Sequence, residues 1–256
     1  MCELQKIALV TNATDYAGPA AVDALIAAGF VVIAHDDAFS DYVRWDAFEL
    51  AHRGAKRVGA TAASDIIDVA WEMHGRVDAI ISNDHFPAIQ RPISDTTSDD
   101  LRDTLETLLV RPFALVRAAV PRLRRQGTGN VVMITSCRTR LPIPGAAIPD
   151  AARAAANALV RSFATELAPH AIAINAIAPN FLYSEAYYPR AVFIDDAGGR
   201  EFVRTYVPVG RLGEPAEIGE LIAYLASTSS RFLTRAVIDF AGGWPTAPLR
   251  PGPQKR

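Results

Sequence analysis

The chain has 256 residues, of which 50% are hydrophobic and 21% are charged, a balance typical of one globular domain with a buried core. The formal net charge of -2 argues against a nucleic-acid partner and against an anionic membrane surface. No apolar run reaches the length of a membrane span, and Met1–Lys6 has no signal-peptide pattern. The two cysteines, Cys2 near the terminus and Cys137 deep in the chain, do not suggest a disulfide. We therefore expect a cytoplasmic protein.

Short apolar runs typical of strands alternate with helical patterns along the chain. Strands are expected over Ile7–Val10, Val31–Ala34, Val77–Ser82, Asn130–Ser136, Ile172–Ala178 and Val237–Phe240. Helices are expected over Gly18–Ala28, Ile66–Met73, Leu101–Leu123, Asp150–Leu167 and Pro215–Ala226. Pro112 is expected to kink the third of these helices, because proline removes a backbone donor. The alternation predicts a Rossmann-like α/β fold, with helices on both faces of a doubly wound parallel sheet.

No linker or internal repeat divides the chain, so residues 1–256 are expected to form a single domain. A proline-containing tail over about 245–256 is expected to wrap over a surface. The five histidines have no metal-ligand spacing, so no metal is expected.

The turn after the first strand reads Thr-Asn-Ala-Thr-Asp-Tyr-Ala-Gly over Thr11–Gly18. In a dinucleotide-binding turn, glycines let backbone amides approach the pyrophosphate at a helix N-terminus. Here the Tyr16 side chain would project into that space, and Gly18 alone remains at the end of the turn. Asp36 follows the second strand, where such folds hold a ribose, and we interpret it as a relic or a solvated residue. The turn therefore predicts that no dinucleotide is bound.

Several separate landmarks fall in the order and spacing of one family. They are Thr11, Asn83, Ser136, Pro179, Arg211–Ile218 and the pair Gly242-Gly243. Over nearly the whole chain they resemble the short-chain dehydrogenases/reductases. That family has Thr-Gly-x-x-x-Gly-x-Gly in its first turn, and a Ser, Tyr and Lys at its catalytic site. Counting from Ser136, the resemblance places Pro149 at the Tyr position and Arg153 at the Lys position.

The halohydrin dehalogenase branch of that superfamily is a better match. Its members bind no nucleotide, carry an aromatic residue in the first turn, as Tyr16 is here, and use Ser, Tyr and Arg. They close a haloalcohol to an epoxide and release halide. The segments Ser82–Asp84, Arg111–Leu115 and Pro179–Leu182 also resemble this branch. The catalytic Tyr is the missing feature, because Pro149 has no side-chain proton to exchange.

The resemblance implies that Ser136 holds the substrate oxygen, although a serine there can equally satisfy local backbone. Arg153 would supply positive charge, with Asp84 as a candidate partner, or form a structural ion pair. Pro149 and Asp150 suit the first turn of a helix. The group replacing the missing Tyr is left open among Asp84, Asp150, Tyr183, Tyr187 and Tyr188.

A substrate and anion pocket is expected around the loop after the sixth strand, where backbone amides and apolar walls can hold a halide. Its residues are predicted to be Tyr16, Phe86, Pro87, Pro179, Asn180, Phe181, Leu182, Tyr187 and Tyr188. The alternative is an ordinary connection covered by core aromatics. Cys137 is expected in the core, facing away from Ser136.

Three functions fit these residues. The first is a cofactor-independent enzyme resembling halohydrin dehalogenases, acting on a small haloalcohol or epoxide, with altered or lost activity. The second is an atypical NAD- or NADP-dependent oxidoreductase of the same superfamily, and the third is a catalytically silent ligand-binding or scaffold protein. The expected partners are a small-molecule substrate and a halide or other small anion. By resemblance, the helices Leu101–Leu123 and Asp150–Leu167 are expected to build a homodimer or homotetramer.

Overall fold

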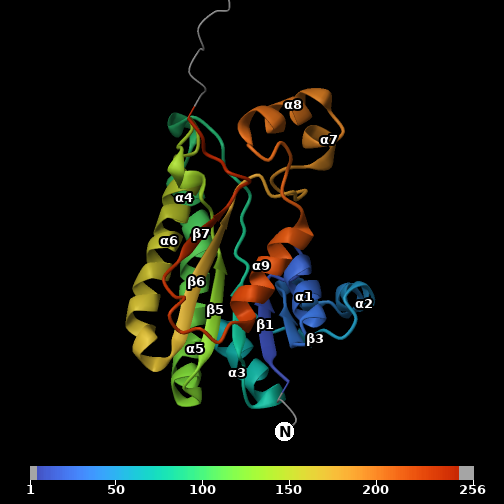
Figure 1. Cartoon of the computed structure of the whole chain (residues 1–256), viewed down its shortest axis with the longest axis vertical. Coiled ribbons are helices and arrows are strands. Elements are labelled where there is room, and N and C mark those ends of the chain that lie inside the picture. Colours follow the sequence, from blue (N-terminus) through green and yellow to red (C-terminus); the bar gives the residue numbers. More distant parts are fainter. Residues whose placement is uncertain (1–4, 248–256) are drawn as a thin grey trace, which may run out of the picture.

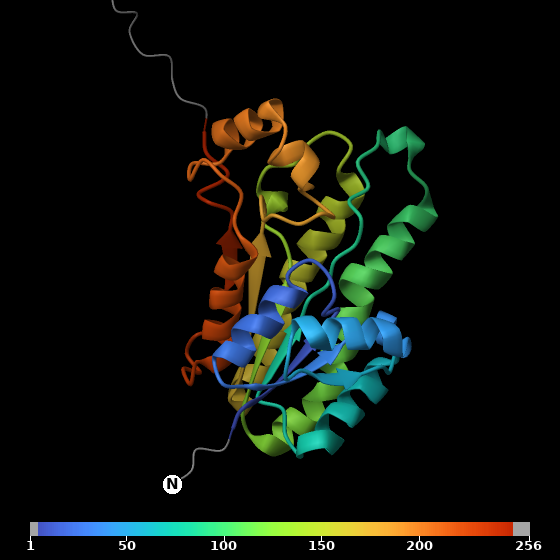
Figure 2. The ribbon, with the colours of Figure 1, turned by 90° about the vertical axis from the view of Figure 1, so that its right-hand side faces the viewer.

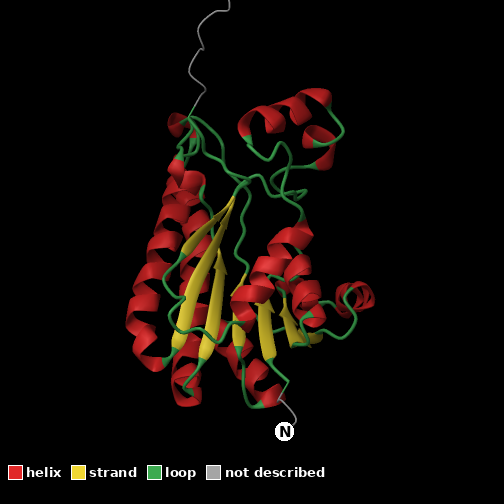
Figure 3. Ribbon diagram, in the orientation of Figure 1, coloured by secondary structure: helices red, strands yellow, loops and turns green. Residues whose placement is uncertain are grey.

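Parallel strands form one sheet at the centre of the protein in the computed structural model, which describes residues 5–247 (Figures 1 and 3). The strands are β1 (Ile7–Thr11), β2 (Val31–His35), β3 (Lys56–Val58), β4 (Ala79–Ser82), β5 (Gly129–Ile134), β6 (Ile172–Pro179) and β7 (Val237–Phe240). They are ordered β3-β2-β1-β4-β5-β6-β7 in a 7-stranded sheet, and each pair of neighbours is parallel. The predicted doubly wound, single-domain α/β fold is confirmed.

Helices pack on both faces of the sheet (Figures 1 and 2). On one face lie α1 (Gly18–Ala27), α2 (Tyr42–Ala51) and α9 (Pro215–Ser227). On the other lie α3 (Ala63–His74), α5 (Arg111–Gln126) and α6 (Ala147–Leu167). Each layer buries a large apolar cluster against the sheet, because strands covered on both faces are apolar along their whole length. No helix within residues 5–247 has the length and apolarity needed to cross a membrane.

The helix expected over Leu101–Leu123 is divided. It comprises α4 (Ser98–Leu105), a π-helical turn over Glu106–Val110 and then α5. The Arg111 N–H donates to the carbonyl of Glu106, five residues earlier, so the wider turn comes directly before Pro112. Pro112 is then an early residue of α5, where a missing N–H costs little. The expected irregularity at Pro112 is thus a change of helix type just before the proline.

The chain reverses its direction across the sheet between β1 and β4, and ligands of such folds bind at the carboxyl ends of strands near this switch point. Two short helices, α7 (Arg190–Phe193) and α8 (Ala197–Tyr206), belong to the long segment after β6 and stand above this edge (Figure 1). The predicted site residues follow β1, β4, β5 and β6, so the topology brings them to the same edge.

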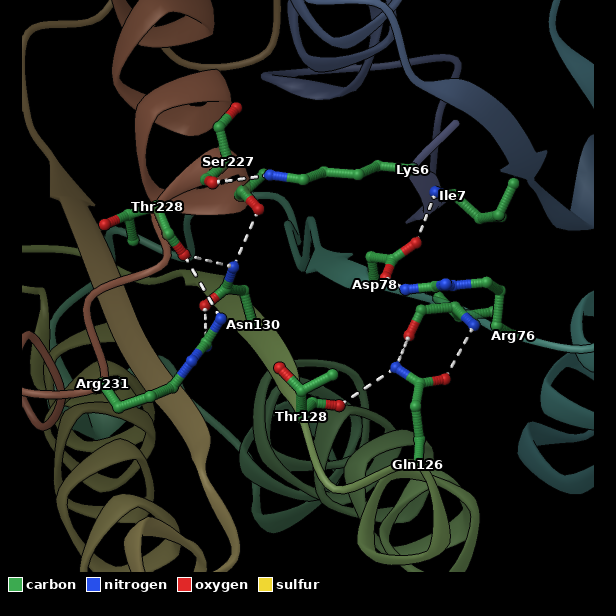
Figure 4. A network of polar contacts seen from close by, with 12 residues as sticks. Lys6, Ile7, Arg76, Asp78, Gln126, Thr128, Asn130, Ser227, Thr228 and Arg231 are labelled. Carbon is green, nitrogen blue, oxygen red and sulfur yellow. Dashed lines mark hydrogen bonds and ion pairs between the residues drawn. The ribbon is translucent and has the colours of Figure 1, made fainter. Parts of the chain in front are cut away.

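A network of polar side chains lies at the amino-terminal ends of the strands, opposite the predicted site (Figure 4). We call this side of the sheet the amino-end edge and the opposite side the carboxyl-end edge. Asn130 donates from its side-chain amide to the carbonyls of Ala226 (2.8 Å) and Thr228 (3.1 Å). Arg231 donates to the Asn130 side-chain oxygen at 2.6 Å. Asp78 accepts from the Ile7 N–H at 2.8 Å, which ties β4 to β1. These contacts connect the starts of the strands to the ends of the helices. Of the predicted tail, residues 248–256 lie outside the described residues.

Candidate functional site

A cavity of about 770 Å³ lies at the carboxyl-end edge of the sheet. It contains nearly the whole predicted site. The predicted residues that line it are Tyr16, Phe86, Pro87, Ser136, Arg153, Pro179, Asn180, Phe181, Leu182, Tyr187 and Tyr188, with Pro149 beside them. Aromatic and aliphatic side chains with a few polar atoms form its wall, as in small-molecule sites generally. Asp84 is the predicted site residue that does not line it.

Ser136 lies two residues beyond the end of β5, because the strand ends at Ile134 and not at Ser136 as expected. Its hydroxyl donates to the Pro179 carbonyl at 3.0 Å and accepts from the Arg138 N–H at 3.1 Å. The Asn157 side chain, on α6, donates to the Ser136 carbonyl at 2.9 Å. The hydroxyl is therefore fixed at the cavity wall, and it can donate to a ligand oxygen by exchanging its bond to Pro179.

Arg153 reaches the cavity from α6 and is only 7% exposed. Its Nη1 donates to the carbonyls of Asp84 (3.0 Å) and Ile134 (3.4 Å), and its Nη2 lies 3.5 Å from the Tyr187 hydroxyl oxygen. Asp84 is thus a partner of Arg153, but through its backbone carbonyl and not through the carboxylate that we expected. A buried guanidinium satisfied mainly by neutral oxygens keeps its charge available to the cavity.

The Asp84 carboxylate accepts from the Ser82 hydroxyl at 2.5 Å, and Asp84 is not among the residues that line the cavity. Burial raises the pKa of Asp84 to about 6, against the opposing effects of the Ser82 hydrogen bond and the Arg153 charge. The side chain is 6% exposed. Asp84 therefore titrates just below neutral pH beside the site, and its carboxylate does not reach the ligand space.

Pro149 lies in the first turn of α6, which begins at Ala147. Asp150 follows it, and its carboxylate oxygen lies 3.3 Å from Nε of Arg138. Burial raises the pKa of Asp150, while the charge of Arg138 lowers it. The structural role predicted for this pair at a helix start is confirmed by their position. Pro149 is buried and contributes apolar wall to the cavity.

The turn between β1 and α1 is filled by its own side chains. Tyr16 has a backbone φ of 54°, in the left-handed region, and its ring packs edge-on against Tyr187 with centroids 5.1 Å apart. Burial raises the pKa of Tyr16, so its hydroxyl stays protonated. The Asn83 side chain donates to the carbonyls of Asn12 (2.8 Å) and Asp15 (2.9 Å), which fixes the turn to β4.

Asp36 is a structural residue of this turn. Its carboxylate accepts from the Thr14 hydroxyl (2.7 Å), the Thr14 N–H (3.1 Å) and the Ala38 N–H (2.9 Å). Asp36 is partly exposed, and its three hydrogen bonds give it a structural role that the sequence did not indicate. Close packing explains the glycine at position 18, because a Cβ there would lie 2.5 Å from the Asn12 carbonyl oxygen. The glycine that remains serves helix packing against the turn.

Two aromatic residues of the cavity wall, Phe202 and Tyr206, were missed because α8 was not predicted. Their i, i+4 spacing is the signal that could have indicated one helix face. Cys137 is 1% exposed, and burial raises its pKa to about 12, so it is the expected core thiol. Tyr183 donates to Glu185 at 2.6 Å and lines a second cavity, of about 710 Å³, under α7 and α8.

No group of three or more His, Cys, Asp or Glu side chains in the described part of the chain is arranged to hold a metal ion. A family model described as enoyl-(acyl carrier protein) reductase matches residues 59–245. The chain belongs to the short-chain dehydrogenase/reductase superfamily. A dehydrogenase subunit from Thauera aromatica, (2S)-[(R)-hydroxy(phenyl)methyl]succinyl-CoA dehydrogenase subunit BbsC, is 32% identical over 93% of this chain and 94% of its own length.

Solved structures of dehalogenating enzymes of this superfamily are also similar to the chain. A halohydrin dehalogenase (HheC) bound to ethyl (2S)-oxiran-2-ylacetate is 33% identical, with a TM-score of 0.92 over 96% of this chain and 100% of that one. A structure described as a dehalogenation enzyme is 32% identical, with a TM-score of 0.91 over the same shares of the two chains. The chain is thus similar to both oxidoreductases and dehalogenases of its superfamily.

Proposed function

We propose that this protein is a nicotinamide-independent enzyme that interconverts a small haloalcohol and an epoxide. The observation that carries the proposal is the filled turn between β1 and α1. In a dinucleotide-binding superfamily member, this space must admit a pyrophosphate against bare backbone amides. Here the Tyr16 ring, which belongs to that turn, lines the cavity and packs edge-on against Tyr187. A nicotinamide dinucleotide does not fit these residues.

The acid that would hold an adenosine ribose supports the same proposal. The Asp36 carboxylate accepts from three donors of the turn, the Thr14 hydroxyl, the Thr14 N–H and the Ala38 N–H. These bonds use most of its acceptor sites, which leaves little capacity for a ribose. The substrate space of this protein is therefore the cavity of about 770 Å³ between Tyr16 and the segment after β6.

In the proposed reaction, Ser136 donates a hydrogen bond to the substrate oxygen and holds that oxygen against the cavity wall. The substrate hydroxyl gives its proton to a basic group of the site, and the positive charge of Arg153 stabilises the alkoxide, because a buried site screens that charge little. The alkoxide oxygen attacks the neighbouring carbon, the carbon–halogen bond breaks, and halide leaves.

The leaving halide is proposed to bind at Pro179–Leu182. This segment lines the cavity; Pro179 has no N–H and the Asn180 N–H donates to the Phe240 carbonyl, so the amides proposed for the halide are those of Phe181, whose φ is 56°, and Leu182. Apolar side chains around such amides weaken the competition from water. The small anion would take the same place in the reverse reaction, the opening of an epoxide.

The test is an assay with 1-chloropropan-2-ol as substrate, in which released chloride and formed epoxide are measured with and without added NAD and NADP. The proposal predicts one chloride per epoxide and a rate that does not depend on either dinucleotide. A reaction that consumes the dinucleotide and releases no chloride would contradict it and favour an oxidoreductase.

A second candidate is a silent subunit of a larger dehydrogenase. It is favoured by the 32% identical relative, which is named as a dehydrogenase subunit, together with the expected loss of the catalytic Tyr at Pro149. This candidate predicts neither chloride release nor dinucleotide turnover by the isolated protein. Chloride release that is lost in a Ser136→Ala variant excludes it.

A further inference from the structure

The hydroxyl of Tyr187 reaches across the cavity from the segment after β6 to the segment after β4. It donates to the Phe86 carbonyl at 2.6 Å, and its oxygen accepts from the Phe86 N–H at 3.0 Å. Both residues line the cavity. The backbone of Phe86 therefore fixes the position of the phenol oxygen, and this oxygen can still accept a further hydrogen bond.

The same oxygen is the nearest side-chain oxygen partner of Arg153 within the described residues, at 3.5 Å from Nη2. The other hydrogen bonds of the guanidinium go to the carbonyls of Asp84 and Ile134. One charged and one neutral N–H thus point at the Tyr187 oxygen, which is the atom that carries negative charge once its proton leaves. Charge-assisted donors to an oxyanion are the strong ones.

We propose that Tyr187 is the proton acceptor of this site and that Arg153 positions it and stabilises its phenolate. This inference rests on the proposed function. In the reaction, the Tyr187 phenolate takes the proton of the substrate hydroxyl. The alkoxide oxygen then forms a bond to the neighbouring carbon and halide leaves with the bonding electron pair. Tyr187 afterwards releases the proton to solvent, so haloalcohol gives epoxide, halide and one proton.

The two other tyrosines of the segment are placed differently. Tyr188 donates to the Asn180 side-chain oxygen at 2.6 Å, and burial raises its pKa to about 12. Tyr183 donates to Glu185 and lines the second cavity. Neither hydroxyl lies within hydrogen-bond distance of Arg153 in the described part of the chain, so Tyr187 alone combines the cavity with the guanidinium.

The two acids that also remained open are engaged elsewhere. Asp84 accepts from Ser82 and does not line the cavity. Asp150 lies against Arg138 at the start of α6. Of the groups that the sequence left open, only the Tyr187 side chain both lines the cavity and lies within hydrogen-bond distance of Arg153.

Tyr16 fits the same inference. Its edge-on contact with Tyr187 restrains the ring whose hydroxyl must stay on Arg153 and Phe86. The proposed proton acceptor therefore lies in the segment after β6, and the Tyr16 ring packs against it.

The test compares Tyr187→Phe with Tyr183→Phe, the same substitution in the same segment but outside the cavity. With 1-chloropropan-2-ol, Tyr187→Phe should lower kcat by about a hundredfold or more and change KM little. Tyr183→Phe should keep both values at the wild-type level. A purely structural latch would instead raise KM and lower the melting temperature with little effect on kcat; that result would overturn the assignment.

Chloride release by wild type tests the proposed function, and the ratio of kcat between wild type and Tyr187→Phe tests the proton acceptor. Chloride release by Tyr187→Phe at the wild-type rate would overturn the role of Tyr187 and leave the proposed function standing. No chloride release by wild type would overturn both proposals.

Discussion

The two edges of the sheet use polar residues in opposite ways. At the amino-end edge, side chains such as Asn130 and Arg231 bond to one another and to backbone carbonyls at 2.6–2.8 Å (Figure 4). At the carboxyl-end edge, Arg153 and Tyr187 are held by backbone groups and still face a cavity. One edge connects strands to helices, while the other holds polar atoms ready for a ligand. Substitutions at the two edges should therefore affect different properties.

The largest effect should come from Ser136→Ala at the carboxyl-end edge. Loss of a donor to the substrate oxygen should lower kcat/KM for chloride release by about a thousandfold, while stability changes little. Ser227→Ala is the matched control, because that hydroxyl donates to the Ala223 carbonyl within α9 at the other edge. The kinetics of chloride release and the thermal unfolding of both variants are measured and compared with those of wild type. Unchanged turnover in Ser136→Ala would remove this residue from the mechanism.

The next effect concerns pH and Asp84. Burial raises its pKa in the folded state to about 6 from the usual 3.8, so the folded protein binds this proton more tightly than the unfolded chain. The stability from this group is present below pH 4 and is lost as pH rises through 6. Asp84→Asn should therefore increase the free energy of unfolding at pH 8 by up to about 3 kcal/mol, with little change at pH 4.

Denaturant titrations of Asp84→Asn and wild type at both pH values test this expectation. Glu217→Gln is a control of opposite sign, because the hydrogen bond and charge of Arg211 lower the pKa of Glu217 to about 2. That variant should be less stable than wild type at pH 8. Equal stability of Asp84→Asn and wild type at pH 8 would mean that the buried carboxylate is better compensated than its contacts indicate.

A smaller effect is expected from Asn130→Ala at the amino-end edge. The change leaves the Ala226 and Thr228 carbonyls and the Arg231 guanidinium without this partner, which should lower the free energy of unfolding by about 2 kcal/mol. Turnover of the folded protein should stay at the wild-type level, since no cavity residue is touched. A surface control, Ser64→Ala, should stay within about 0.5 kcal/mol in the same denaturant titration. Loss of turnover in folded Asn130→Ala would contradict the separation of the two edges.

The fold could be predicted from the sequence because buried parallel strands are almost wholly apolar. Runs such as Ile7–Val10 and Ile172–Ala178 have the length of strands and are too short for typical helices, and turns separate them from the next element. β3 was missed because Lys56–Val58 is a three-residue edge strand with two charged side chains. α2 was missed with it, since only Trp45 and Phe48 of that helix are buried.

The location of the site followed from strand ends, but its contacts did not. Ser136, Arg153 and Tyr16 could be placed by resemblance at one edge, and the structure brings them to one cavity. That Arg153 uses the carbonyl of Asp84, and meets Tyr187, depends on how two long connections fold back over the sheet. Local sequence patterns carry no information on such non-local contacts between irregular segments.

We propose that the cavity takes a small alcohol and an anion in place of a dinucleotide. The decisive experiment is a calorimetric titration with NAD and NADP, followed in the same cell by bromide or azide. We expect no heat of binding from either dinucleotide and a saturable signal from the anion. Tight binding of NAD or NADP would contradict it and return the protein to redox chemistry.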